Sequence, residues 1–129
     1  PLVAGVCALM KTVNPCLTPA MAQQIIKQTA DPIADASKYQ GMLGAGRINA
    51  YKAVKETVDQ SALRIENKII TTNRTENAVF RINVNNVKIQ NNPTVILNAR
   101  NEIIVENFEI TKGAVLELNT NPNLNVICQ

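Results

Sequence analysis

The sequence changes character near residue 60, and this change divides the chain into two parts. Residues 1–60 carry apolar side chains at helical spacing, whereas residues 61–129 form short β-type runs separated by asparagine. Two asparagines, Asn14 and Asn49, lie in the first part, and fifteen lie in the second. The pattern predicts an α+β chain in which helices are followed by a small all-β module.

Three helices are expected in the first part. Residues 2–13 are apolar on nearly every face, which is typical of a helix packed on all sides inside a larger domain. Asn14-Pro15 ends this helix, because proline disfavours the helical conformation of the residue before it. Thr18 is then expected to cap a second helix, in which Pro19 takes the first position.

Asp31-Pro32 ends the second helix, and Asn49 is expected to cap a third helix over residues 50–57. Apolar stripes at spacings of three and four mark the inward faces of both helices. These stripes consist of Ala22, Ile25, Ile26 and Thr29 in the second helix and Ala50, Ala53, Val54 and Val58 in the third.

The β module is expected to contain many short strands with asparagine at the corners, because asparagine tolerates left-handed backbone conformations. Alternation is clear where Phe80, Ile82 and Val84 are interleaved with polar residues. Such strands suit either a small sandwich or a short β-solenoid. The expected strands are residues 63–65, 68–72, 79–83, 87–89, 94–97, 103–105, 108–110 and 115–118.

Composition argues against several classes of binding protein. The net charge of +3 is spread evenly along the chain, which argues against a nucleic-acid surface. Aromatic residues make up 3% of the chain, so the stacking platforms of single-strand binders are missing. No membrane span is predicted, because the apolar stretch at residues 2–10 falls short of the roughly 20 residues that a span needs. It also lacks the preceding basic residues of a signal peptide.

The cysteines do not form a recognisable framework. Three are too few for a disulfide-based fold, and no CxxC spacing exists to hold zinc. Cys7 lies inside an apolar run and is interpreted as a small core residue. A Cys16–Cys128 bridge is an option in a secreted protein. Neither a cofactor nor a metal site is predicted.

Four short motifs follow one another in the first part. Residues 1–6 (PLVAGV) match the end of G-T-S-x-A-x-P-x-V-A-G, and residues 14–19 (NPCLTP) match N-P-x-L-T-P. Residues 29–32 (TADP) and 44–54 (GAGRINAYKAV) match T-A-x-P and G-x-G-x-x-N-A-x-x-A-V. With these motifs in this order and spacing, residues 1–58 resemble the C-terminal part of a subtilisin-family (subtilase) serine protease.

The resemblance implies a catalytic serine four positions before Pro1, outside this chain, and a Ser-His-Asp triad in an upstream catalytic domain. It also implies a peptide or protein substrate and a secreted or cell-surface location. Leu2 takes a position that is often histidine in the family, and the sequence contains no histidine. No catalytic residue is therefore predicted within this chain, which is not expected to be active alone.

The β module has a looser resemblance of its own. Residues 94–118, with Phe108 and the run GAVLEL at residues 113–118, resemble the C-terminal β-modules of secreted bacterial proteases and adhesins. Such modules are accessory or surface-associated units.

Other candidate sites have simpler interpretations. Gly44-Ala45-Gly46 lacks the surrounding strand and the Lys-Ser/Thr of a phosphate loop, and it predicts a turn. Asn73-Arg74-Thr75 is a glycosylation sequon that matters only in a secretory pathway that glycosylates. The acidic candidates are interpreted as solvated charges, and the basic ones as the polar face of the third helix. They are Asp31, Asp35, Glu102, Glu106 and Glu109, and Arg47, Lys52 and Lys55.

Three hypotheses for function follow. The first is the C-terminal segment of a subtilisin-like endopeptidase. The second is a non-catalytic, β-rich surface binding or anchoring protein that retains three subtilase helices. The third is a structural piece that self-associates through exposed helix surface. They differ in what covers the helix of residues 2–13.

Overall fold

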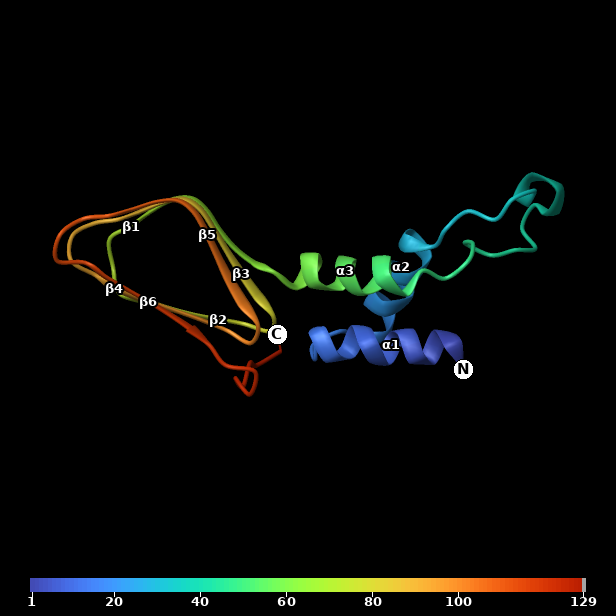
Figure 1. Ribbon diagram of the computed structural model, residues 1–129, viewed down its shortest axis with the longest axis horizontal. Helices are drawn as coiled ribbons and strands as arrows, with labels where there is room; N and C mark the ends of the chain where they lie inside the picture. Colours follow the sequence, from blue (N-terminus) through green and yellow to red (C-terminus); the bar gives the residue numbers. More distant parts are fainter. Residues whose placement is uncertain (129) are drawn as a thin grey trace. The chain divides into compact units, whose positions relative to one another are not determined.

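The computed structural model describes residues 1–128 and divides the chain into two compact units, with the division between residues 60 and 61. Unit 1 carries the helices and unit 2 carries the strands (Figure 1). The α+β class expected from the sequence is confirmed.

Unit 1 contains α1 (Leu2–Val13), α2 (Pro19–Thr29), the short 3-10 helix η1 (Ala36–Tyr39) and α3 (Ala50–Ser61). The caps are those expected. Thr18 Oγ1 accepts a hydrogen bond from the Met21 amide at 3.2 Å, and Asn49 Oδ1 accepts one from the Lys52 amide at 2.9 Å. The third helix runs past residue 57, where it was predicted to end, because Thr57 and Val58 continue its buried face.

The core of unit 1 joins the three α-helices. Ala22 and Ile25 of α2 and Ala53 of α3 are buried, as the stripes predicted, whereas Ala50, also predicted to face inward, is exposed at the start of α3. Thr57 was not in the predicted stripe, although it is buried. Its hydroxyl donates to the Ala53 carbonyl oxygen at 2.8 Å, and this bond makes burial of a polar group tolerable. The core residues are Val6, Met10, Leu17, Ala22, Ile25 and Ala53.

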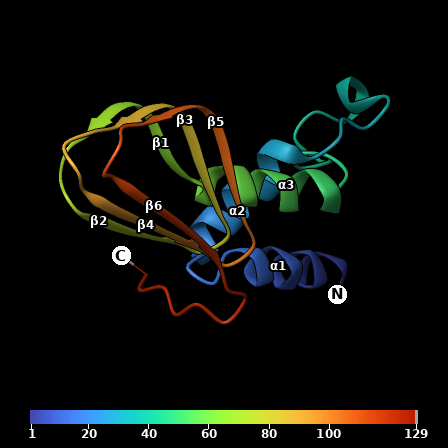
Figure 2. The ribbon, with the colours of Figure 1, turned by 60° about the vertical axis from the view of Figure 1, so that its left-hand side comes forward.

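Unit 2 contains β1 (Leu63–Ile70), β2 (Arg74–Ala78), β3 (Arg81–Ile89), β4 (Thr94–Ala99), β5 (Glu102–Ile110) and β6 (Val115–Thr120). All pairing is parallel, in the orders β1-β3-β5 and β2-β4-β6 (Figure 2). Consecutive strands therefore alternate between two sheets. We call β1 with β2 coil 1, β3 with β4 coil 2, and β5 with β6 coil 3. Coils stacked in this way form a short β-solenoid, the second of the two predicted alternatives.

The prediction of eight short strands was wrong. Three of the six observed strands continue through an asparagine that was expected to separate two strands. These residues are Asn67, Asn86 and Asn107, and each has a positive φ of 48° to 54°. Asparagine adopts this conformation more easily than other residues, so each strand bends there without ending.

One continuous ladder of asparagine side chains connects all three coils, and a separate asparagine pair joins coils 1 and 2. Asn98 Nδ2 donates to Asn77 Oδ1 at 2.9 Å, and Asn119 Nδ2 donates to Asn98 Oδ1 at 3.0 Å. At the bend, Asn86 Nδ2 donates to Asn67 Oδ1 at 2.8 Å. These hydrogen bonds pair the side-chain amides of asparagines on neighbouring parallel strands. Because a shifted register would break them, they favour one register of stacking.

The interior of the solenoid is filled by aliphatic side chains at alternate positions of the strands. Coil 2 lies between the other two coils, and its inward residues are the most completely covered. The buried residues of this core are Ile65, Ile70, Ala78, Ile82, Val84, Val87, Ile89, Val95, Leu97 and Ala99.

Candidate functional site

Helix α1 has one buried stripe, and exposed apolar residues lie on both sides of it. Val6 and Met10 are buried in the core of unit 1. Leu2, Val3 and Leu9 are each more than half exposed. The sequence predicted a helix packed on all sides, and the described residues cover only part of it. Apolar side chains of α1 that remain in water do not contribute the favourable free energy that their burial would give.

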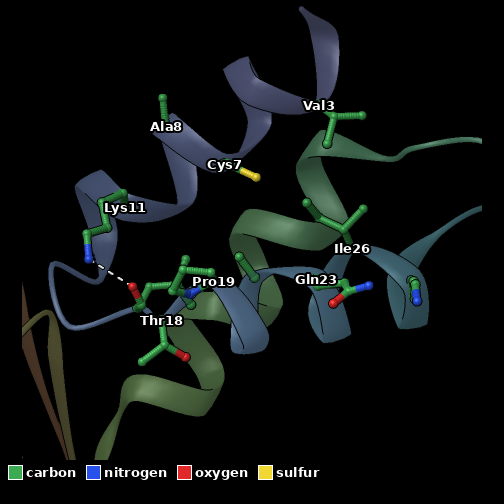
Figure 3. Close-up of a pocket in the computed structure, with 11 residues that line it drawn as sticks. Val3, Cys7, Ala8, Lys11, Thr18, Pro19, Gln23 and Ile26 are labelled. Atoms are coloured by element: carbon green, nitrogen blue, oxygen red, sulfur yellow. Dashed lines mark hydrogen bonds between the residues drawn. The ribbon is translucent and has the colours of Figure 1, made fainter.

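A mostly apolar groove of about 690 Å³ lies between α1 and α2 (Figure 3). Val3 and Ile26 are among its lining residues, together with the thiol-bearing Cys7. At one end, Lys11 Nζ donates to the Leu17 carbonyl oxygen at 2.8 Å. Val3 lines the groove on one side of the buried stripe, and Leu2 and Leu9 lie on the other side; we call these exposed apolar residues and the groove together the α1 surface.

The three cysteines are in two chemical states. Cys7 is a free thiol that packs, partly buried, against the core of unit 1, in agreement with its interpretation as a small core residue. Cys16 and Cys128 are both disulfide-bonded. The bridge between these two residues that the sequence suggested stays a prediction, and peptide mapping under non-reducing conditions would test it.

Asp31 and Arg47 connect the two ends of the long loop between α2 and α3. Their backbones form a two-residue antiparallel bridge, with the Asp31 amide donating to Arg47 O at 2.8 Å and the Arg47 amide donating to Asp31 O at 2.9 Å. Gly46 has a φ of 128°, and a Cβ atom at this position would collide with the Asp31 carbonyl oxygen. Glycine is therefore required beside the bridge.

The side chain of Asp31 anchors the same bridge. It accepts hydrogen bonds from Lys52 Nζ at 2.6 Å and from Asn49 Nδ2 at 2.9 Å, and Arg47 Nη2 lies 3.7 Å away. The bond from Lys52, followed by that from Asn49, holds the pKa of Asp31 below its ordinary value. From the sequence, Arg47 and Lys52 were interpreted as part of the exposed polar face of the third helix. Their convergence on one carboxylate was not visible, because the partner lies 16 or more residues away.

Three of the other four acidic candidates form separate ion pairs, and the fourth, Glu106, lies exposed on β5. Glu102 Oε1 lies 2.7 Å from Arg81 Nη2, and Glu109 Oε1 lies 2.9 Å from Lys88 Nζ. Asp35 lies 3.0 Å from Lys38 in an exposed pair. Across residues 1–128, no group of three histidine, cysteine or acidic side chains is placed to hold a metal ion.

The remaining candidates have structural positions. Gly44 lies in a turn, as expected, and Gly46 follows that turn; both have positive φ. Asn73, the sequon asparagine, lies between β1 and β2, where its Oδ1 accepts a hydrogen bond from the Thr94 amide at 2.8 Å. Lys55 pairs with Asp59, and this pair raises the pKa of the lysine.

Within residues 1–128, none of the helices combines the length and the hydropathy that a membrane crossing requires. Comparison with known proteins adds no assignment: no family model, curated protein or solved structure matches the chain.

Proposed function

We propose that this chain is the C-terminal segment of a secreted subtilisin-like serine endopeptidase, and that its helices complete a catalytic domain lying upstream. The observation that carries the proposal is the α1 surface. An apolar helix with Leu2, Val3 and Leu9 in water indicates a lost partner, since exposed patches of this kind usually mark an interface.

The structural roles of the motif residues support the same proposal. In the segment NPCLTP, Asn14 is buried and accepts a hydrogen bond from the Cys16 amide, while Thr18 caps α2. In the segment GAGRIN, Gly46 fits closely against Asp31, while Asn49 caps α3. The residues that define the resemblance are thus those that fix the turns of unit 1.

The proposed reaction is acyl transfer from a peptide bond to the upstream serine, with histidine and aspartate also supplied from upstream. The helix that contains α1 would then direct its N-terminal dipole and N–H groups toward the developing oxyanion. Unit 1 supplies the body of that helix and its packing. Unit 2 is an accessory module at the cell surface or in the secreted protein.

The second hypothesis, a β-rich surface binding or anchoring protein, is favoured by a different observation. Unit 2 has its own buried core, centred on Ile82 and Val95, which does not depend on a catalytic domain. The two hypotheses separate at the start of the polypeptide, because only the protease requires a serine four positions before Pro1.

The test is active-site labelling of the protein isolated from its native source. A fluorophosphonate reacts with the activated serine of such enzymes and leaves unactivated serines unmodified. We expect a labelled polypeptide whose tryptic map contains residues 1–128 together with a modified serine four positions before Pro1. A native polypeptide that contains these residues and takes up no label would contradict the proposal. The matched control is the same sample denatured before labelling.

A further inference from the structure

The inward side chains of coil 3 are much less covered than their counterparts in coil 2. Leu97 of β4 is 2% exposed, whereas Leu118, its partner in the register of β6, is 45% exposed. Ile89 of β3 is 1% exposed, whereas its β5 partner Ile110 is 41% exposed. The apolar interior of the solenoid thus opens to water at coil 3.

Coil 3 also presents open strand edges. β5 and β6 are the last strands of their sheets among the described residues, so one edge of each has no backbone partner there. An open edge with unpaired N–H and C=O groups is a template for another strand. Here the template is continuous with the parallel pairing that already joins coils 1, 2 and 3.

The hydrogen bonds of the asparagine ladder all run in the same direction along the stack of coils. In each step, the Nδ2 of the later coil donates to the Oδ1 of the earlier one, from Asn98 to Asn77 and from Asn119 to Asn98. Asn119 also donates to Glu117, so both of its amide protons are engaged. Its Oδ1 receives no hydrogen bond from the residues that the structure describes. An added strand therefore meets an acceptor at this position.

The negative charge of coil 3 favours a basic partner strand. Its strands carry Glu102, Glu106, Glu109 and Glu117 and no basic residue. Within the solenoid, Arg81 and Lys88 of the neighbouring coil already pair with Glu102 and Glu109, whereas Glu106 lies exposed on β5. A strand placed on the open edge of coil 3 is therefore favoured when it carries lysine or arginine.

Coil 1 of a second copy of this chain fits the edge poorly. The opposite end of the solenoid is coil 1, where Arg74 and Glu76 occupy the positions that Val95 and Leu97 hold in coil 2. Stacking coil 1 of one copy on coil 3 of another would place this charged pair against Leu118 and its neighbours. Burial of charges against an apolar end is unfavourable, and polar terminal coils prevent such stacking.

We propose that the edge formed by β5 and β6 binds an extended segment of another polypeptide, which adds in parallel as a further strand layer. Its apolar residues cover Leu118 and Ile110, and its lysine or arginine residues alternate with them and face the carboxylates of coil 3. An amide side chain donates to Asn119 Oδ1. This inference rests on unit 2 alone and is independent of the proposed protease.

The probe is a fluorescein-labelled synthetic peptide with the sequence of residues 79–100. It carries Arg81, Lys88 and Asn98 at the positions that pair with coil 3 inside the solenoid. We titrate it with the full chain at low salt and follow fluorescence anisotropy. Circular dichroism of each protein variant checks that the chain is folded.

The expected result is saturable binding that Leu118→Lys weakens at least about tenfold, because it places a charge among apolar contacts. The matched control is Ile69→Lys, an exposed isoleucine on β1, which leaves binding unchanged. Glu106→Lys, on the outward face of β5, is expected to weaken binding severalfold at low salt and by less at high salt. If Leu118→Lys does not fold, the effect of Glu106→Lys on peptide binding tests the proposal instead.

Three results would overturn the proposal. One is a peptide that does not bind, or that binds all three variants and the wild type equally. Another is concentration-dependent dimerisation of the wild-type chain, measured by sedimentation, that Leu118→Lys abolishes, since a second copy would then occupy the edge. The third is a native polypeptide whose own additional residues protect the β6 amides from hydrogen exchange.

Discussion

The two units of this chain bury their apolar residues to different degrees. Coil 2 of the solenoid, lying between two other coils, covers Ile82 and Val95 completely, while α1 leaves Leu2 and Leu9 more than half exposed. Unit 1 has a buried core as well, around Met10 and Ile25, but its first helix keeps apolar side chains in water, as coil 3 does in unit 2. A strand layer between two others is covered on both sides, whereas exposed apolar side chains such as those of α1 usually mark an interface.

The largest expected difference is between truncations in the two units. Ile82→Ala removes buried atoms from the solenoid core and is expected to destabilise unit 2 by about 3 kcal/mol. Leu9→Ala removes an exposed side chain and is expected to change stability by less than about 0.5 kcal/mol. Urea unfolding of the full chain, followed by circular dichroism, measures both. Equal losses of stability would contradict the difference in burial between Ile82 and Leu9.

A smaller effect is expected from two glycines of unit 1. Gly46→Ala places a methyl group on the Asp31 carbonyl oxygen at a φ of 128° and is expected to cost about 2 kcal/mol. Gly5 lies inside α1 with no atom within 4 Å of an added Cβ, so Gly5→Ala is expected to gain up to about 1 kcal/mol. Thermal unfolding distinguishes the two. A neutral Gly46→Ala would show that the Asp31–Arg47 bridge does not support unit 1.

In the solenoid, the asparagine ladder is expected to contribute less than the core. Asn98→Ala removes one donor and one acceptor from the middle of the ladder, at an expected cost of about 1–2 kcal/mol. Asn101→Ala, in the exposed turn before β5, is the matched control and is expected to be nearly neutral. The urea midpoint is the measurement. If both variants behave alike, the ladder is not what fixes the register.

The smallest expected effect is the acid sensitivity of unit 1. The hydrogen bond from Lys52 holds the pKa of Asp31 below its ordinary value of 3.8. Such a carboxyl stabilises the fold above its ordinary pKa, and the contribution is lost as pH falls through the lowered value. We therefore expect unit 1 to lose stability below about pH 4, and Asp31→Asn to reduce this dependence.

Urea midpoints between pH 7 and pH 2 give the measurement for Asp31→Asn. Asp35→Asn, at an exposed pair with Lys38, is the control that should keep the wild-type profile. Identical profiles for both variants would contradict the role given to Asp31.

Local signals in the sequence were sufficient for unit 1. Proline and polar caps act on the residues beside them, so Asn14-Pro15 and Thr18-Pro19 fix helix ends without reference to distant contacts. The position of Asp31 beside Lys52 depends on the path of a long loop, for which the sequence carries no local signal.

Unit 2 was harder to predict because its pairing is non-local. β2 (Arg74–Ala78) was missed, since Arg74 and Glu76 break the apolar alternation that marks a strand. The separation of 21 residues between pairs such as Asn77 and Asn98 was the signal that distinguishes a solenoid from a sandwich. The open edge of coil 3 was identified from the strand register and the burial of side chains. Neither can be predicted from the sequence before the pairing of the strands is known.

Intact mass and N-terminal sequencing of the protein as isolated from its native source test the proposed protease origin. We expect a polypeptide longer than the present 129 residues that carries Gly-Thr-Ser upstream of Pro1, with the serine four positions before it. In that protein the α1 surface is covered by the upstream domain. A native polypeptide that begins at or near Pro1 would contradict the claim, and unit 2 and its open edge would then carry the function.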